Sequence, residues 1–434
     1  MDKLTLKQRA LQIADLATSL ANELNETDHP EPTFQHGLPT PLRSDAPPSK
    51  ASQIYKQLAQ TVDELSALLT DPVHHLTHEL KLPTASIHPL IRLGIASHFP
   101  PHGSSVQDLA QDLGLDESLV RRLLAHSATY HVFYEERKDY FVHTPASRLL
   151  AENDKLREWV AMAAEETLPA TLKIAQALSQ YPDSQEPDQC GWSIANNTVK
   201  SAFEAMGSDP TKEKRFAHAM QYRSQQPGFA AQHLVSAFPW PNGDPISKFT
   251  VVDIGGGLGH VSRVLAGYAP NATFIVQDTE SVVERGKATL ASDTEVKTES
   301  GERGLQDRVR FQVHDFFTEQ PVHGADVYLL RFILHDWSDK YAGIILRALI
   351  PAMRKGCKVV LNERVVPGWH ERHYLEERRR RDSDMYMLGF QNGRERTVDD
   401  LSALLRSVDE RFELAKVHQP EGSVLAVVEI TWRA

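Results

Sequence analysis

The sequence predicts an α/β protein with a doubly wound sheet in its C-terminal part and a mainly helical region before it. From Phe249 onward, short apolar runs alternate with helical stretches, a pattern typical of a parallel sheet with crossover helices. Residues 86–150 instead contain two short helices and then two short strands, the order of a winged helix-turn-helix. At 434 residues, the chain is long enough for more than one domain of the usual size, roughly 150 residues.

Composition narrows the class of protein. With 41% hydrophobic and 24% charged residues, the chain is expected to be globular with a real core, not a disordered chain, a collagen or a small disulfide scaffold. Its 58 acidic and 47 basic residues give a formal charge of −11, which argues against nucleic acid or an anionic membrane as partner. Two cysteines, Cys190 and Cys357, fit a reducing compartment. We find no signal peptide and no apolar run long enough to span a membrane, and therefore expect a cytoplasmic protein.

The N-terminal half is expected to serve packing and subunit contact. Apolar residues at helical spacing predict helices over about 4–24 and 52–69, with a Pro-rich linker between them. In the winged-helix region, Asp116 is placed to cap the second helix. A helix that reads DNA needs basic and amide side chains on its outer face, and this helix has only Arg121 and Arg122 there. A structural or dimer-forming role is favoured over DNA binding, and we expect a homodimer whose contact is made mainly by residues 50–150.

The C-terminal strands are predicted from their apolar runs at 249–254, 273–277, 308–313, 325–330 and 357–362, followed by a hairpin of 412–417 and 423–430. Right-handed crossovers would place the ligand site at the carboxyl ends of the parallel strands.

A glycine cluster follows the first of these strands. Gly255, Gly257 and Gly259 let the backbone turn sharply and approach a ligand where a Cβ would collide. The spacing fails the G-x-G-x-x-G pattern of dinucleotide enzymes, and Asp253 before it would repel a pyrophosphate. This favours S-adenosylmethionine, which has no phosphate and carries an ammonium group. The alternative is a tight turn without a ligand.

Two further strand ends carry groups suited to an adenosine. Asp278 ends the second strand, 21 residues beyond Gly257, where an acid can bind ribose hydroxyls; taken alone, it is as readily a helix N-cap. After the third strand, Asp315 would accept from an adenine amino group, and Phe316 or Phe317 would cover the ring. The alternative for these aromatics is simple core packing.

His335 ends the fourth strand and enters a helix, so it faces the expected cleft. Two acids are candidates to orient it, Glu363 at the end of the fifth strand and Glu395 in NGRERT. A carboxylate bonded to one imidazole nitrogen fixes the tautomer and leaves the other nitrogen as a base.

These motifs together resemble a known family. VVDIGGGLGH, FIVQD, HDFF, ADVYLLRFILHDWSD and NGRERT, in this order, are similar to those of S-adenosylmethionine-dependent O-methyltransferases of the plant caffeic acid type. The fungal enzymes that methylate phenolic polyketides resemble the chain more closely. The resemblance covers roughly residues 75–434 and implies a Rossmann-like methyltransferase sheet.

The resemblance also implies site residues. His335 would be the general base, flanked by Glu363 and Glu395. The cofactor would be bound by Asp253, Gly255, Gly257, Gly259, Asp278, Asp315, Phe316 and Arg331. The substrate would be bound by Phe216, Met220, Arg223, Phe332, Tyr386, Met387 and Gln391. Arg223 and Phe332 depart from the His and Trp that the plant enzymes often have, so the substrate itself does not carry over. No metal site is expected.

The expected domains are therefore 1–49, an N-terminal helix and linker; 50–165, a winged-helix dimerisation domain; 166–248, connecting helices that contribute to the substrate pocket; and 249–434, the cofactor-binding methyltransferase domain.

We expect in-line SN2 methylation of a phenolic or enolic hydroxyl on an aromatic or polyketide metabolite of secondary metabolism. Two alternatives remain. One is a pericyclase that holds S-adenosylmethionine for its charge; such relatives tend to replace the base with Arg or Lys. The other is a winged-helix regulator.

Overall fold

The computed structural model describes residues 4–34, 37–42, 48–70, 83–240, 249–292, 305–368 and 374–433. It contains two compact units, which are considered separately. Unit 1 is Met1–Leu168 with Met206–Pro227, and unit 2 is Pro169–Ala205 with Gly228–Ala434. The first segment of unit 1 runs to Leu168, and residues 166–248, expected to be one connecting segment, are divided between the two units.

Unit 1 is mainly helical. Its helices are α1 Leu6–Glu26, α2 Lys50–Leu69, α4 Thr84–Arg92, α5 Ile95–His98, α6 Val106–Leu113, α7 Glu117–Ala128, α8 Pro145–Glu152, α9 Asp154–Met162 and α14 Pro210–Ser224, with a π-helical turn at Ala163–Thr167. α1 packs on α2, and the Pro-rich segment joins this contact because Leu42 is buried with Leu20 and Leu24. That part of the expected linker is therefore packed.

Two helices and a small sheet occupy the region predicted to be a winged helix. Asp116 caps α7 by accepting a hydrogen bond from the Leu119 N–H at 2.9 Å. β2 Phe133–Arg137 and β3 Tyr140–His143 form an antiparallel hairpin, and the short β1 Ser104–Ser105 pairs with β3. Arg121 on α7 is held by Glu117 and Asp139 at 2.8 and 2.6 Å, so acids neutralise one of the two arginines that α7 offers.

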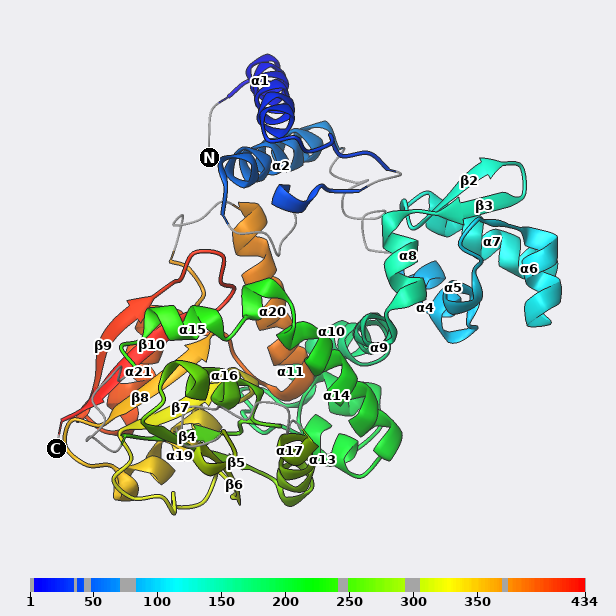
Figure 1. Cartoon of the computed structure of the whole chain (residues 1–434). Coiled ribbons are helices and arrows are strands. Elements are labelled where there is room, and N and C mark those ends of the chain that lie inside the picture. The colour runs from blue at the N-terminus through cyan, green and yellow to red at the C-terminus, as the bar shows by residue number, and fades with distance from the viewer. Residues whose placement is uncertain are drawn as a thin grey trace. The chain divides into compact units, whose positions relative to one another are not determined.

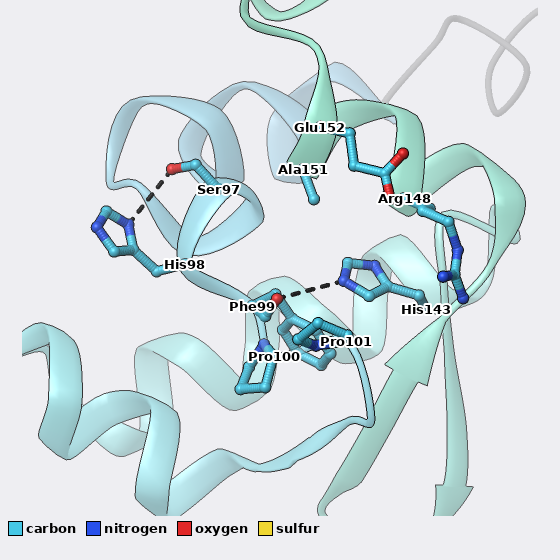
Figure 2. A pocket seen from close by; sticks show the side chains of 9 residues that line it. All are labelled: Ser97, His98, Phe99, Pro100, Pro101, His143, Arg148, Ala151 and Glu152. Carbon is cyan, nitrogen blue, oxygen red and sulfur yellow. Dashed lines mark hydrogen bonds between the residues drawn. The ribbon is translucent and has the colours of Figure 1, made fainter.

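A surface pocket of about 340 Å³ lies beside this hairpin (Figure 2). Its lining residues are Ser97, His98, Phe99, Pro100, Pro101, His143, Arg148, Ala151 and Glu152. The His143 ring is fixed there, because Nε2 lies 3.3 Å from the Phe99 carbonyl oxygen and Nδ1 lies 3.0 Å from Ser147 Oγ. None of the residues predicted to form the functional site lines this pocket.

Unit 2 is built on a seven-stranded sheet (Figure 1). Its strands are β4 Phe249–Ile254, β5 Ala272–Asp278, β6 Val309–Val313, β7 Val327–Arg331, β8 Lys358–Glu363, β9 Phe412–His418 and β10 Ala426–Trp432. The order is β6-β5-β4-β7-β8-β10-β9, with β10 antiparallel to both of its neighbours and the pairs from β6 to β8 parallel. The chain reverses its direction of winding between β4 and β7, and ligands of open α/β sheets bind at such a point.

Helices cover both faces of this sheet. The helices of unit 2 include α11 Ile174–Gln180, α12 Gly191–Ala195, α15 Gln232–Ala237, α16 His260–Tyr268, α17 Glu280–Ser292, α18 Leu305–Arg308, α19 Asp339–Leu349, α20 Tyr374–Gln391 and α21 Val398–Val408, while α10 Leu168–Leu172 and α13 Ala202–Gly207 contain unit boundaries. Alternate strand residues face opposite ways. Val252 accordingly packs in one core cluster with α19 and α21, and Val251 in another with α15 and α16. The continuous apolar runs of the strands follow from burial on both faces.

Among the described residues, no helix combines the length and apolar character needed to cross a bilayer.

Candidate active site

The glycine loop, residues 255–259, turns away from the end of β4 with three left-handed residues. The φ angles of Gly255, Gly257 and Gly259 are 65°, 60° and 73°. A Cβ on Gly255 would collide with the Ile333 side chain, and one on Gly259 would lie 2.9 Å from Phe311 Cζ. A Cβ on Gly257 would meet no heavy atom within 4 Å. Gly257 therefore faces open space, and a ligand can approach its backbone closely.

Asp253 lies on β4, two residues before the glycine loop, and contacts the helix that follows the loop. Its side chain is buried, and Oδ2 accepts a hydrogen bond of 2.6 Å from Ser262 Oγ on α16. Burial raises the pKa of Asp253 to about 6, against the lowering effects of the Ser262 bond and the nearby Arg331 charge. A Cβ on Gly256 would lie 2.6 Å from the Asp253 carboxyl carbon. Direct contact between Asp253 and a cofactor stays a prediction.

Asp278 links the glycine loop to the end of β5. Its Oδ2 accepts from the Gly257 N–H at 2.9 Å, and its Oδ1 accepts from the Thr279 N–H at 2.8 Å. Burial raises its pKa. An ionised carboxylate offers about four acceptor positions, so this group retains capacity for ribose hydroxyls.

The segment after β6 lies beside the same loop. Phe316 Cε1 is 3.8 Å from the position of a Cβ on Gly255, and the His314 N–H donates to the Asp278 carbonyl oxygen at 3.1 Å. Asp315 is exposed, and its Oδ1 accepts from the Phe317 N–H at 3.0 Å. The three strand ends predicted to bind an adenosine therefore meet at one edge of the sheet.

Arg331 ends β7, the strand paired with β4 on the other side. Its guanidinium donates to the Asn362 side chain and to the Phe229 carbonyl oxygen. Burial lowers the pKa of Arg331 to about 10, and the Asp253 charge opposes this shift. Arg331 therefore stays positively charged at neutral pH.

The His335 turn, residues 332–337, follows β7 directly. Phe332 has φ of 55°, which is strained for a bulky residue. This left-handed backbone conformation turns the chain out of the strand and into the 3₁₀ turn Leu334–Asp336. The Phe332 ring centroid lies 5.3 Å from that of His335.

His335 is 3% exposed and lies among carboxylates. Its Nδ1 is 3.1 Å from Glu395 Oε1, and its Nε2 is 3.4 Å from Asp336 Oδ1. Burial by itself would lower the pKa of His335, but the charges of Asp336, Glu395 and Glu363 outweigh it, so the net shift is upward from 6.5. If Nδ1 carries the proton that Glu395 accepts, Nε2 is the nitrogen left to act as a base.

Glu395 is held as an ionised carboxylate. Ser383 Oγ donates to its Oε1 at 2.7 Å, and Arg364 Nη1 lies 3.5 Å from the same oxygen. Burial opposes ionisation, but His335 and these two residues overcome it and lower the pKa of Glu395 to about 2. A fixed negative charge beside Nδ1 stabilises the imidazolium that forms when Nε2 takes up a proton.

Glu363 acts on the backbone. Its Oε1 accepts from the N–H groups of Ile333 and Leu334 at 3.0 and 2.6 Å. Burial raises its pKa. Of the two acids expected to flank the ring, Glu395 thus contacts the imidazole, whereas Glu363 holds the backbone that leads to it.

The residues expected to bind substrate fall in both units. In unit 2, Tyr386, Met387 and Gln391 lie on α20; Gln391 is 2% exposed and its Nε2 donates to the Asp336 carbonyl oxygen at 3.4 Å, while Tyr386 is 44% exposed. Phe332, in the His335 turn, also belongs to unit 2. In unit 1, the other three lie on α14: Phe216, Met220 and Arg223. Their role toward a substrate stays a prediction.

Sequence reasoning missed several contacts around His335. Asp336 and Arg396 directly follow His335 and Glu395 in the sequence, and this adjacency is the only signal that points to them. Arg364 and Ser383 reach Glu395 through tertiary folding, 31 and 12 residues away along the chain, and carry no motif of their own. Among the described residues, no group of His, Cys, Asp and Glu is arranged to hold a metal ion.

The fold and site define a Rossmann-like methyltransferase. The family model for an O-methyltransferase domain matches residues 183–409. The grayanic acid biosynthesis cluster O-methyltransferase of Cladonia grayi is 36% identical over 415 residues, covering 94% of this chain and 84% of that protein. The chain belongs to this family of O-methyltransferases, and it is an S-adenosylmethionine-dependent enzyme of secondary metabolism.

Solved structures agree on the fold. The crystal structure of OxaC superposes with a TM-score of 0.75 at 20% identity, covering 98% of this chain and all (100%) of that one. A structure described as a pericyclic reaction enzyme superposes with a TM-score of 0.73 at 22% identity, again covering 98% and 100%. At these identities the likeness shows the fold alone.

Proposed function

We propose that this enzyme methylates a phenolic or enolic hydroxyl of an aromatic or polyketide metabolite, with His335 as the general base. The observation that carries the proposal is the placement of His335. It is buried at the carboxyl end of β7, its Nδ1 lies on Glu395, and β7 pairs directly with β4, from which the glycine loop leaves. A base and an open, glycine-lined backbone thus lie at neighbouring strand ends.

The residues present fit S-adenosylmethionine. Gly257 presents backbone to open space that a Cβ would enter, and the Asp278 carboxylate lies beside it. Asp315 and Phe316 would hold the adenine, Asp278 the ribose, and the glycine loop the remainder of the molecule. When bound, this cofactor supplies an electrophilic methyl group on a sulfonium.

The chain itself supplies proton removal and alignment. A phenol has a pKa of about 10, by analogy with tyrosine, so it is mostly protonated at neutral pH. His335 Nε2 takes the proton, and Glu395 stabilises the charge that forms on the ring. General base catalysis of this kind typically contributes about 10²–10⁴-fold. An aliphatic alcohol would need far more help than one imidazole provides, which favours phenols and enols as substrates.

The experiment is to incubate the protein with methyl-labelled S-adenosylmethionine and a panel of phenolic polyketides. We expect label in a product methyl ether from the wild type and a strong loss with His335→Ala. A substrate converted without transfer of label would instead indicate the alternative, a pericyclase that holds S-adenosylmethionine for its charge. The His335–Glu395 pair supports methyl transfer, because the pericyclases that resemble this family tend to have Arg or Lys in place of the base.

We further infer a cytoplasmic homodimer that does not bind nucleic acid. Cys190 and Cys357 are both free and buried, which supports a reducing compartment. The acids that hold Arg121 support a winged-helix region used for packing. Light scattering of the full chain should give twice its mass of 48.7 kDa, and a stable monomer would contradict the dimer. No retardation of duplex DNA is expected at physiological salt.

A further inference from the structure

We propose that Glu363 and Arg396 form a two-sided clamp on the backbone of the His335 turn, so that both are positioning residues for His335. From one side, Glu363 at the end of β8 accepts the N–H groups of Ile333 and Leu334. From the other side, Arg396 Nη1 donates to the Leu334 carbonyl oxygen at 2.8 Å, and Nη2 donates to that of Trp337 at 2.9 Å. Two buried side chains of opposite charge thus bracket the residue that carries the imidazole.

The segment that carries Arg396 packs tightly against the same turn. The Arg394 N–H donates to the His335 carbonyl oxygen at 2.8 Å. A Cβ on Gly393 would lie 2.5 Å from that oxygen and 2.8 Å from the Asp336 carbonyl carbon, so only glycine fits without displacing the turn. Arg396 is itself 2% exposed, and its Nε donates to Asp339 Oδ1 at 2.9 Å. Burial and the Asp339 carboxylate therefore hold the Arg396 guanidinium in place beside the turn.

The turn needs such support for a physical reason. It starts at Phe332 with a strained left-handed backbone, and a residue held in that region costs of order 1–3 kcal/mol unless its surroundings enforce it. A 3₁₀ turn of three residues also leaves backbone N–H and C=O groups without internal partners. The clamp satisfies these groups with charged partners, whose hydrogen bonds are stronger than neutral ones. The Glu395 bond orients the ring, and the clamp fixes the Cα from which the ring projects.

This inference rests on the proposed role of His335, and the two can fail separately. Hydrogen–deuterium exchange on the full-length protein reports the clamp without any activity. In Glu363→Ala and Arg396→Met, the peptide covering residues 332–337 should exchange faster than in the wild type, because its amide and carbonyl partners are gone. Unchanged exchange in both variants would overturn the clamp, whatever His335 does in the reaction.

Kinetics then test whether the clamp positions His335. In both variants kcat should fall by about 10- to 100-fold, since a misplacement of about 1 Å can cost that much. The affinity for S-adenosylmethionine, measured by calorimetry, should change less than about twofold. Arg406→Met is the matched control, because Arg406 is an exposed arginine in the last turn of α21 and takes no part in the clamp. Its kcat should fall less than about twofold.

Conservative variants separate a backbone clamp from an electrostatic partner of the ring. Glu363→Gln keeps an oxygen that accepts both N–H groups but loses the charge, so it should retain at least about five times the kcat of Glu363→Ala. Arg396→Lys keeps the charge but cannot bridge two carbonyl groups, so it should resemble Arg396→Met. Equal losses in the Gln and Ala variants, or full activity in the Lys variant, would overturn the proposal. The Gln and Lys variants keep a polar group in each position, so they are the ones to use if the larger changes prevent folding.

Discussion

The glycine loop and the His335 turn leave neighbouring parallel strands at the same edge of the sheet, but they are built in opposite ways. The glycine loop has three left-handed glycines, and Gly257 faces open space. The His335 turn has its backbone bonded by Glu363, Arg394 and Arg396. The difference shows how one edge serves two purposes. An open backbone leaves room for a ligand to come close, and a bonded backbone fixes the position from which one side chain projects.

The largest expected effect is the loss of the base. His335→Ala should lower kcat by about 10²–10⁴, or about 3–5 kcal/mol at 1.36 kcal/mol per tenfold. Cofactor affinity should hardly change, because the glycine loop is a separate element. Steady-state kinetics and calorimetry check the two parts. Near-normal turnover with the same acid limb in the pH profile would mean that His335 is only a residue at the start of a turn.

The second expected effect comes from filling the open space at the glycine loop. Gly257→Val places a branched Cβ in the space before the loop and on a backbone with φ of 60°, where strain costs about 1–3 kcal/mol. S-adenosylmethionine should bind at least about tenfold more weakly by calorimetry. Gly267→Ala is the control, because Gly267 lies inside α16 and a Cβ there also meets nothing within 4 Å. Equal affinity in a folded Gly257→Val protein would remove the loop from the cofactor site.

A smaller effect concerns pH. The carboxylates around His335 raise its pKa above 6.5, and only the neutral imidazole can accept a proton. The rate should therefore fall as pH drops through a midpoint above 6.5. Asp336→Asn removes a negative charge 3.4 Å from Nε2, so it lowers the pKa and moves the midpoint down by about one pH unit. Asp399→Asn, on the exposed face of α21, should leave the midpoint in place. An unmoved midpoint in Asp336→Asn would show that this charge does not reach the base.

The smallest effect on kcat is expected from Ser383, which contacts Glu395 and not the His335 ring itself. Ser383→Ala removes the hydroxyl that donates to Glu395 at 2.7 Å. One hydrogen bond contributes about 0.5–1.5 kcal/mol net, so kcat should fall about two- to tenfold. Rate measurements at saturating substrate decide this. A loss as large as that of His335→Ala would mean that Ser383 does more than hold Glu395.

The sequence predicted the architecture of unit 2 well for a physical reason. Strands buried on both faces are continuous apolar runs bounded by turn residues, and every strand predicted for the sheet is present. Parallel strands also end at one edge, so motifs at strand ends, such as Asp278 and His335, were expected to meet there. The structure brings these strand ends to one edge.

The partners of those groups were much harder to predict. Glu363 was expected beside the imidazole, but the pairing of β7 with β8 brings its carboxylate to the backbone of Ile333 and Leu334. Ser383 meets Glu395 because α20 returns past the site. Such contacts depend on register and helix rotation, which no local pattern specifies. Burial of Leu42 likewise depends on how α1 and α2 meet.

The position of β10 has a consequence for how the protein is made. β10 pairs with β8 on one side and β9 on the other, although it follows both in the sequence. While a ribosome is still elongating the chain toward Ala426, β8 has one edge without its partner. Unpaired edges of apolar strands invite association with other chains. Nascent copies of this enzyme therefore expose an unpaired edge of β8 until β10 has been synthesised.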